Sequence, residues 1–289
     1  MKILIIGNGL LGTSLIKRLE SENHTLMVFS RKYRGEIECE QKVGDIFNFD
    51  NFKNVFNWKP QIVINTAWIT TPGIYRNDPS NHMYSQFTVD LANYLSHTDV
   101  EHIINFGTCA EYGPQSEPIE AGTTQLAPTT LYGEQKVAAY RGVELSLKGT
   151  EIRSTWARIF YPYGPGQDPH RLIPMLINAI RDGKEIKLND TSSQYDWISA
   201  RDVASAISWV IRTDLPSQID VGTSVGHTNL QILETLYRML IPQGGMPSNL
   251  NHDFGLDEKL IVSKNSPLLK SGWVAQDSLE SGLQLVLEA

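Results

Sequence analysis

Several features that define large functional classes are scarce in this 289-residue sequence. It has only two cysteines, Cys39 and Cys109, too few for a disulfide framework or a zinc site, and this fits a reducing compartment such as the cytoplasm. Acidic residues outnumber basic ones by 32 to 25, which argues against a nucleic-acid or membrane-surface partner, because both favour a basic face. No apolar run has the length that a bilayer requires. We therefore expect a cytoplasmic globular protein without a metal centre.

The first eleven residues are apolar enough to suggest a signal peptide. The stretch is short, however, it carries glycines where a strand would turn, and a polar helical pattern follows it. We interpret it as a buried strand.

Short apolar runs alternate with helical periodicity over the first 160 residues. We expect strands at 2–6, 25–29, 42–44, 61–65, 102–106 and 152–159, and helices at 13–22, 51–58, 81–96 and 131–147. This alternation, with strands that are apolar throughout, predicts an α/β fold with a parallel sheet covered on both faces.

The pattern changes after residue 160, where proline and glycine become frequent. We expect helices at 173–181 and 202–212 and short strands at 185–188 and 218–221. The interpretation is a sheet domain over residues 1–159 plus about 198–222, interleaved with a smaller region over 160–197 plus about 223–289.

A glycine-rich turn follows the first expected strand and opens the first helix. It reads Gly7-Asn8-Gly9-Leu10-Leu11-Gly12. Glycines at this spacing suit a tight turn, a close approach of the backbone to a pyrophosphate, and close packing of helix on strand. The helix N-terminus offers free N–H groups to the phosphates. The alternative is a tight strand–turn–helix connection without a ligand.

The second expected strand ends in Ser30-Arg31-Lys32. An NAD enzyme usually places an acidic residue here, to accept from the ribose 2′-OH. Arginine followed by lysine suits a 2′-phosphate, so NADP(H) is favoured over NAD(H), and a solvated basic turn is the alternative. Asp45, after the third strand, could accept from the adenine amine or could be a plain turn residue.

Tyr132 and Lys136 lie four residues apart, and therefore on one face of the helix expected at 131–147. An ammonium near a phenol favours the phenolate, so we expect Lys136 to lower the tyrosine pKa. Such a tyrosine can exchange a proton with a sugar or alcohol oxygen. Thr108 follows the fifth strand, at the edge of the sheet where ligands bind, and its hydroxyl could hold the reacting oxygen. Alone it would more often be a helix cap.

The glycine-rich turn, the threonine after the fifth strand and the Y-x-x-x-K together resemble the extended short-chain dehydrogenase/reductase family, of the NAD-dependent epimerase/dehydratase type. Segments 128–133 (P-T-T-L-Y-G), 158–166 (R-I-F-Y-P-Y-G-P-G) and 196–204 (D-W-I-S-A-R-D-V-A) are similar to its nucleotide-sugar-modifying members. The likeness runs from residue 1 to about 221 and thins beyond it.

The resemblance implies a Rossmann doubly wound parallel sheet, with the nicotinamide beside Tyr132, and a smaller C-terminal region that grips a nucleoside diphosphate sugar. It adds Ile46, Thr66, Ala67 and Phe160 to the expected cofactor contacts. The expected substrate contacts are Trp68, Cys109, Glu111, Tyr161, Arg171 and Tyr195. Family members often dimerise through the helices expected here at 81–96 and 131–147, so a homodimer is an expectation.

Individual positions qualify the resemblance. Arg171 would suit the diphosphate, although it could equally be a surface charge. Tyr161 stands where family members often carry an asparagine that contacts substrate. Tyr195 stands where the family usually has an arginine that reaches the substrate phosphates, and this departure puts the mode of nucleotide binding in doubt.

Two absences narrow the expected reaction. The 4,6-dehydratases of the family carry Asp-Glu directly after the threonine, whereas this chain has Cys109-Ala110. The epimerase-reductases that make GDP-fucose use a cysteine two residues past the catalytic serine, and Cys109 comes one residue too early. We interpret Cys109 as a small buried residue rather than as a displaced acid or base. Segments 65–68 (N-T-A-W) and 72–75 (P-G-I-Y) are similar to sugar-nucleotide 4-ketoreductases.

The sequence thus predicts NADP(H)-dependent reduction of a 4-keto sugar nucleotide, in the 6-deoxyhexose series, with Tyr132 as general acid. A 4-epimerase that retains its NAD(H) is the main alternative. A non-catalytic NADP-binding regulator on the same fold is a third interpretation, but such proteins commonly lose the tyrosine or the lysine, and both are present here.

Overall fold

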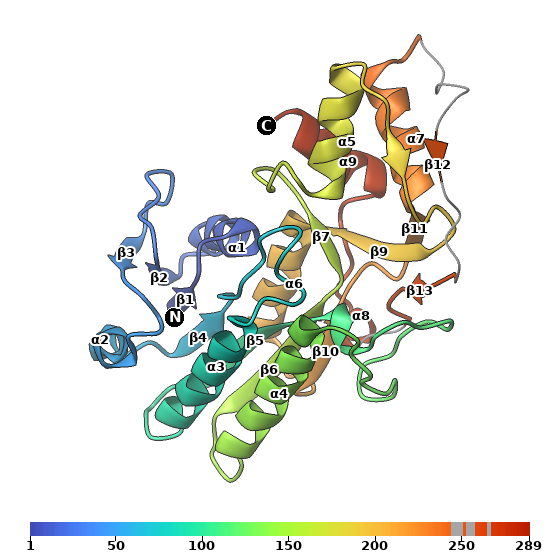
Figure 1. Cartoon of the computed structure of the whole chain (residues 1–289). Coiled ribbons are helices and arrows are strands. Elements are labelled where there is room, and N and C mark those ends of the chain that lie inside the picture. The colour runs from blue at the N-terminus through green and yellow to red at the C-terminus, as the bar shows by residue number, and fades with distance from the viewer. Residues whose placement is uncertain (244–250, 253–257, 265–266) are drawn as a thin grey trace.

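The computed structural model describes residues 1–243, 251–252, 258–264 and 267–289. A parallel sheet of seven strands forms its centre, in the order β10-β6-β5-β4-β1-β2-β3 (Figure 1). These strands are β1 (Lys2–Ile6), β2 (Thr25–Ser30), β3 (Glu40–Val43), β4 (Ile62–Asn65), β5 (His102–Thr108), β6 (Arg153–Ile159) and β10 (Gln218–Val221). The predicted α/β class with a parallel sheet is confirmed.

Helices cover both faces of this sheet because its central strands are apolar on both sides. In β1, Ile3 and Ile5 belong to one hydrophobic core, with helices α1 (Leu10–Glu20) and α6 (Ala200–Arg212). Leu4 and Ile6 belong to the opposite core, with α3 (Asn81–Leu95) and α4 (Leu131–Ser146). Figure 1 shows α3 and α4 side by side on one face and α6 on the other. The carboxyl ends of the strands thus meet along a single edge between two helical layers.

A smaller lobe stands beyond that edge. Its sheet contains β7 (Tyr161–Tyr163), β9 (Gln194–Ser199), β11 (Gly226–Thr228) and β13 (Leu260–Ile261). Its helices are α5 (Leu172–Arg181), α7 (Asn229–Leu240) and α9 (Leu279–Leu287), which share one apolar core. Short pieces complete it, namely β8 (Lys187–Leu188), paired with β12 (Asn251–His252). The chain passes between the lobes repeatedly, because α6 and β10 return to the large sheet, and so does α8 (Pro267–Lys270).

Three segments differ from the sequence-based expectation. The helix expected at 51–58 is a short α2 (Phe49–Phe52) followed by a 3-10 helix, η1 (Lys53–Trp58), which ends where Lys59 adopts a left-handed φ of 52°. The strand expected at 185–188 has two residues. The proline- and glycine-rich segment after residue 160 contains β7, because Tyr161 to Tyr163 pair in parallel with β9.

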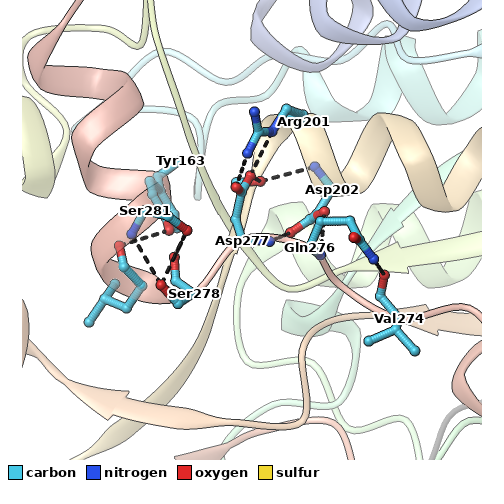
Figure 2. Close-up of polar contacts among 10 residues, drawn as sticks. Tyr163, Arg201, Asp202, Val274, Gln276, Asp277, Ser278 and Ser281 are labelled. Atoms are coloured by element: carbon cyan, nitrogen blue, oxygen red, sulfur yellow. Dashed lines mark hydrogen bonds and ion pairs between the residues drawn. The ribbon is translucent and has the colours of Figure 1, made fainter.

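Two aspartates in segment 196–204 hold the chain together rather than facing a ligand. Asp196 is fully buried and accepts from the backbone N–H groups of Thr223 at 2.7 Å and Ser224 at 3.0 Å. Asp202 accepts from the N–H groups of Gln276 at 2.9 Å and Asp277 at 2.8 Å (Figure 2). Segment 196–204 therefore binds the backbone of two loops that are distant in the sequence, at 223–224 and 276–277.

Asp277 itself adds further contacts beside the hydrogen bonds of Asp202. Figure 2 shows its carboxylate beside Arg201, with which it forms an ion pair. The hydroxyl of Ser199 also donates to Asp277, at 2.6 Å. These hydrogen bonds and this ion pair fix the chain just before α9 onto the start of α6. They thereby join the small lobe to the large sheet.

Candidate active site

The glycine-rich turn is closed tightly at two positions and open at the third. Gly7 has a φ of +101°, and a Cβ there would lie 2.6 Å from the Thr66 hydroxyl oxygen. That hydroxyl donates to the carbonyl of Ile6 at 3.0 Å. A Cβ on Gly12 would lie 2.3 Å from the carbonyl oxygen of Gly7, so glycine is required there for α1 to pack on β1. Gly9, in contrast, has no neighbouring atom within 4 Å of an added Cβ.

The N-terminus of α1 suits a diphosphate. No side chain caps this end of the helix, and no acidic residue lies in its first turn, which begins with Leu10 and Leu11. Its partial positive charge is therefore unopposed locally, beside the open backbone at Gly9. These residues fit the pyrophosphate of a dinucleotide cofactor.

The basic residues after β2 lie at the same turn. The side chains of Asn8 and Ser30 both donate to the carbonyl oxygen of Lys32 at 2.8 Å, which ties this loop to the glycine-rich turn. The side chains of Arg31 and Lys32 are exposed. The side chain of Arg31 is therefore accessible to solvent at this turn.

The end of β3 approaches the same region. Gly44, directly before Asp45, donates its backbone N–H to the carbonyl of Ser30 at 3.0 Å, which brings the chain at Asp45 close to the chain at Arg31. Asp45 is exposed and accepts from the N–H of Phe47 at 3.0 Å, while Ile46 is buried in the core below. This contact is typical of an aspartate in a turn. That Asp45 accepts from the adenine amine stays a prediction.

Tyr132 lies in the first turn of α4, which starts where the Thr130 hydroxyl accepts from the N–H of Gly133. Its phenol is hydrogen-bonded to Thr108, and its ring meets that of Tyr75 edge-on at 5.1 Å. Burial raises the pKa of Tyr132 above its usual range, and the bond to Thr108 offsets only part of this. The expected lowering by Lys136 is not observed, so the phenol is protonated and suited to donating a proton.

Lys136 lies one turn further along α4 and is buried. Its Nζ donates to the carbonyl of Phe106 at 2.6 Å and sits 3.7 Å from the centroid of the Trp68 ring. The same Nζ is 6.0 Å from the centroid of the Tyr132 ring. Burial lowers the pKa of Lys136 to about 7, against an opposing effect of the Glu111 carboxylate.

Thr108, Tyr132 and Lys136 therefore converge at the carboxyl end of β5. Thr108 is the last residue of that strand, and its hydroxyl accepts from the N–H of Ala110 at 3.2 Å. A hydroxyl that orients an oxygen, a phenol that carries a proton and a nearby ammonium form the set that proton transfer to a carbonyl oxygen requires. The side chain of Trp68 supports the lysine, while its Nε1 donates to Asn81 at 2.7 Å. Ala67, beside it, is half-buried.

Three residues expected in the site are buried. Glu111 is fully buried in an ion pair with Arg158 at 2.7 Å, so the expected substrate contact is corrected. Phe160 is buried in one apolar cluster with Cys109 and Tyr112, and the cofactor contact expected of it stays a prediction. Burial raises the pKa of the Cys109 thiol well above its ordinary value, which excludes a thiolate acid–base role.

The other expected substrate residues lie together on the small-lobe side. The ring centroids of Tyr161 and Tyr195 are 4.6 Å apart, with the ring planes tilted by 54°. The hydroxyl of Tyr195 donates to Asp190 at 2.5 Å. Arg171, just before α5, reaches across the lobes to the carbonyl of Thr70 and lies 4.9 Å from the ring centroid of Tyr75.

Sequence reasoning missed Arg76. Its carbonyl accepts from the N–H of Tyr132 at 2.8 Å, and its charge acts on the pKa of Tyr161 and Tyr195. Among the described residues, Arg76 and Arg171 form no ion pair with an acid, although both lie beside Tyr75. The available signal was an arginine directly after the segment P-G-I-Y, but its proximity to Tyr132 depends on the path of the loop before α3.

Two cavities are not bordered by Thr108, Tyr132 or Lys136. One of about 350 Å³ is bordered by Tyr140, Arg158 and Gln218, and one of about 410 Å³ by Ile46, Phe49 and Phe87. Within the described parts of the chain, no three His, Cys, Asp or Glu side chains are grouped as metal ligands would be. Over the same residues, no helix combines the length and apolarity needed to cross a bilayer.

A Rossmann-type sheet with a glycine-rich turn and a Thr-Tyr-Lys site defines the class of nicotinamide-dependent dehydrogenases and reductases of the extended short-chain type. The family model described as "NAD dependent epimerase/dehydratase family" matches residues 3–222. The chain belongs to this family, and its relatives are nucleotide-sugar epimerases and dehydratases.

Curated relatives are distant but cover most of the chain. A UDP-glucose 4-epimerase of Lactobacillus helveticus is 23% identical over 88% of each chain. A dTDP-glucose 4,6-dehydratase of Escherichia coli is 21% identical, over 100% of this chain and 92% of that one.

Solved structures share the fold. The UDP-glucose 4-epimerase of Thermus thermophilus in complex with NAD has a TM-score of 0.84 at 19% identity, covering 100% of this chain and 98% of that one. The Bacillus anthracis dTDP-glucose 4,6-dehydratase in complex with NAD has a TM-score of 0.83 at 21% identity, covering 100% and 96%.

Proposed function

We propose that this enzyme reduces a 4-keto nucleoside diphosphate sugar, in the 6-deoxyhexose series, with NADPH as the hydride source. The observation that carries the proposal is the convergence of Thr108, Tyr132 and Lys136 at the end of β5. A bound nicotinamide would supply hydride to C4. Tyr132 would donate its proton to the oxygen at C4, which Thr108 orients, and Lys136 would bind the nicotinamide ribose.

Dehydration is not part of the proposal, although several relatives are 4,6-dehydratases. Removing water from the hexose needs an acid and a base beyond the tyrosine. Cys109 is a buried, protonated thiol and Ala110 has no ionisable side chain, so the two positions after Thr108 provide neither an acid nor a base.

NADPH is favoured over NADH because Arg31 and Lys32 are exposed beside the glycine-rich turn and no acidic residue stands at the end of β2. The guanidinium of Arg31 suits a 2′-phosphate. The solved relatives contain NAD, so NAD(H) is the competing cofactor.

For the substrate we propose that Arg171 and Arg76 bind the diphosphate. Both contact Tyr75 and they come from different lobes, so an anion bound by both would draw the lobes together. Arg76 thereby provides a cation near Tyr195, where the family usually supplies its own arginine.

The test is the variant Tyr132→Phe with NADPH and a 4-keto sugar nucleotide. Loss of the general acid should reduce kcat by about 10²- to 10⁴-fold, while NADPH affinity stays within about threefold of wild type. Turnover at the wild-type rate in this variant would remove Tyr132 from the mechanism.

The second candidate is a nucleotide-sugar 4-epimerase, since relatives of that activity cover nearly the whole chain. It would use the same three residues but keep its cofactor, oxidising and then reducing the same carbon. Purified protein that retains NAD(H) through chromatography would favour the epimerase. An empty cofactor site and a preference for NADPH would favour the reductase.

A further inference from the structure

Glu111 is a buried carboxylate directly behind the catalytic residues. Its Oε1 accepts from the backbone N–H of Thr108 at 2.8 Å, and its Oε2 is 2.7 Å from Nε of Arg158. The indole N–H of Trp156 donates to both oxygens, at 3.0 and 3.1 Å. The carboxylate thus accepts from three donors on two neighbouring strands, β5 and β6.

The surrounding sequence is built to hold this carboxylate. A Cβ on Gly107 would lie 2.6 Å from Oε1 of Glu111 and 2.3 Å from the indole nitrogen of Trp156, so only glycine fits there. The guanidinium of Arg158 lies between the rings of Tyr112 and Tyr140, 5.2 and 5.0 Å from their centroids. Burying an ion pair is costly, and stability alone does not call for one, because apolar side chains of similar volume often serve as well.

Two contacts link this carboxylate to the reaction. It fixes the backbone of Thr108, whose hydroxyl is hydrogen-bonded to Tyr132. Its negative charge also opposes the lowering of the Lys136 pKa by burial. The other groups around the ammonium are the Trp68 ring, the Phe106 carbonyl and the Tyr132 phenol.

We propose that Glu111 is a positioning residue, which fixes Thr108 against Tyr132 and places its negative charge at the same end of β5 that the Lys136 ammonium contacts. The proposal rests on the proposed function in assigning those three residues to catalysis. It adds that Arg158 and Trp156 act on the site only through Glu111.

The experiment compares Glu111→Gln with Trp156→Phe. Glutamine keeps the volume and one acceptor oxygen but removes the charge, whereas phenylalanine removes a donor to Glu111 and keeps the charge. We expect Glu111→Gln to lower kcat by about 10- to 100-fold, with KM for both substrates within about threefold of wild type.

The effect of the Glu111 charge is tested by the pH dependence of kcat. Without Glu111 the Lys136 pKa should fall further, so the alkaline limb of kcat should move to lower pH by about one unit in Glu111→Gln and stay in place in Trp156→Phe. Side-chain NMR of Lys136 measures the same shift in the titration midpoint without any substrate. This readout separates the inference from the proposed function, because it holds whichever sugar nucleotide is used.

Glu111→Gln could fail to fold, since it leaves Arg158 buried without its partner. The double variant Glu111→Gln with Arg158→Met removes both charges and should fold, and it should retain the shifted Lys136 midpoint. An unshifted midpoint in whichever variant folds, or equal losses of kcat in Glu111→Gln and Trp156→Phe, would overturn the proposal and leave Glu111 a purely structural residue.

Discussion

At the scale of single residues, burial rather than charge pairing sets the protonation of the site. Burial favours the neutral form of both Tyr132 and Lys136: it raises the pKa of the phenol and lowers the pKa of the ammonium to about 7. The spacing of these two residues predicted their shared helix face correctly. The depth of the site depends on Trp68 and on the loop before α3, so the sequence could not reveal the sign of the tyrosine shift.

Replacing Lys136 by methionine should abolish turnover and change the pH dependence of stability. The pKa of this lysine falls from 10.5 to about 7 on folding, so the unfolded chain binds more protons between these values. The free energy of unfolding of the wild type therefore rises as pH increases through this window. The advantage of Lys136→Met should be largest below pH 7, on the order of a few kcal/mol, and should shrink towards pH 10.5.

Urea unfolding between about pH 6.5 and 10 measures this change. Lys148→Met, which removes an exposed lysine just beyond α4 and keeps Lys136, is the control, and its stability difference from the wild type should be the same across this pH range. A stability difference between Lys136→Met and the wild type that is the same at every pH would contradict the burial argument.

At the scale of elements, the glycine-rich turn was the most predictable part of the site. Its three glycines have separate roles in the structure. Gly7 and Gly12 allow β1 and α1 to pack closely, because a Cβ at either position would clash with a neighbouring oxygen, while Gly9 faces open space. Local spacing suffices to predict such a turn because the turn is built from one short stretch of sequence. The clusters around Glu111 and Arg76 could not be predicted in this way, because their partners come from distant strands and from the course of a loop.

The variants Gly9→Ala and Gly12→Ala should therefore differ. Alanine at position 12 would place Cβ against the Gly7 carbonyl and should cost about 1–3 kcal/mol of stability, as overpacking does. Alanine at position 9 should leave stability within about 1 kcal/mol of wild type but weaken cofactor binding at least about tenfold, by occupying the phosphate cradle. Thermal unfolding and NADPH titration measure both effects. Wild-type cofactor affinity in Gly9→Ala would place the pyrophosphate elsewhere.

At the scale of the whole molecule, the hydrogen bonds of two aspartates, Asp196 and Asp202, connect segments that lie far apart in the sequence. The small lobe brings Tyr161, Tyr195 and Arg171 towards Tyr132, and the contacts of Asp196 fasten the loop after β10. The contacts of Asp202 fasten the chain before α9 (Figure 2). The resemblance to the family located these aspartates but not their role. Their backbone partners lie at 223–224 and 276–277, and such pairings cannot be derived from a single sequence. The homodimer expected through α3 and α4 stays a prediction.

Replacing Asp202 by alanine should release the chain before α9. Two N–H groups, of which that of Asp277 is buried, would lose a charged acceptor, which should cost about 2–4 kcal/mol of stability. Arg201→Ala, which removes the exposed partner of Asp277, should cost less than about 1 kcal/mol. Urea unfolding gives both values, and limited proteolysis should cut the C-terminal segment faster only in Asp202→Ala. Equal costs would show that Asp202 does not fasten the lobes.

The central claim is that hydride passes from NADPH to C4 of a 4-keto sugar nucleotide and that Tyr132 supplies the proton. The most direct measurement is an incubation with deuterated NADPH and a 4-keto-6-deoxyhexose nucleotide, followed by mass spectrometry and NMR of the product. The account predicts one deuterium at C4 and release of NADP⁺, with almost none incorporated by Tyr132→Phe. A product without deuterium, together with interconversion of C4 epimers by a retained NAD, would contradict it and establish the epimerase.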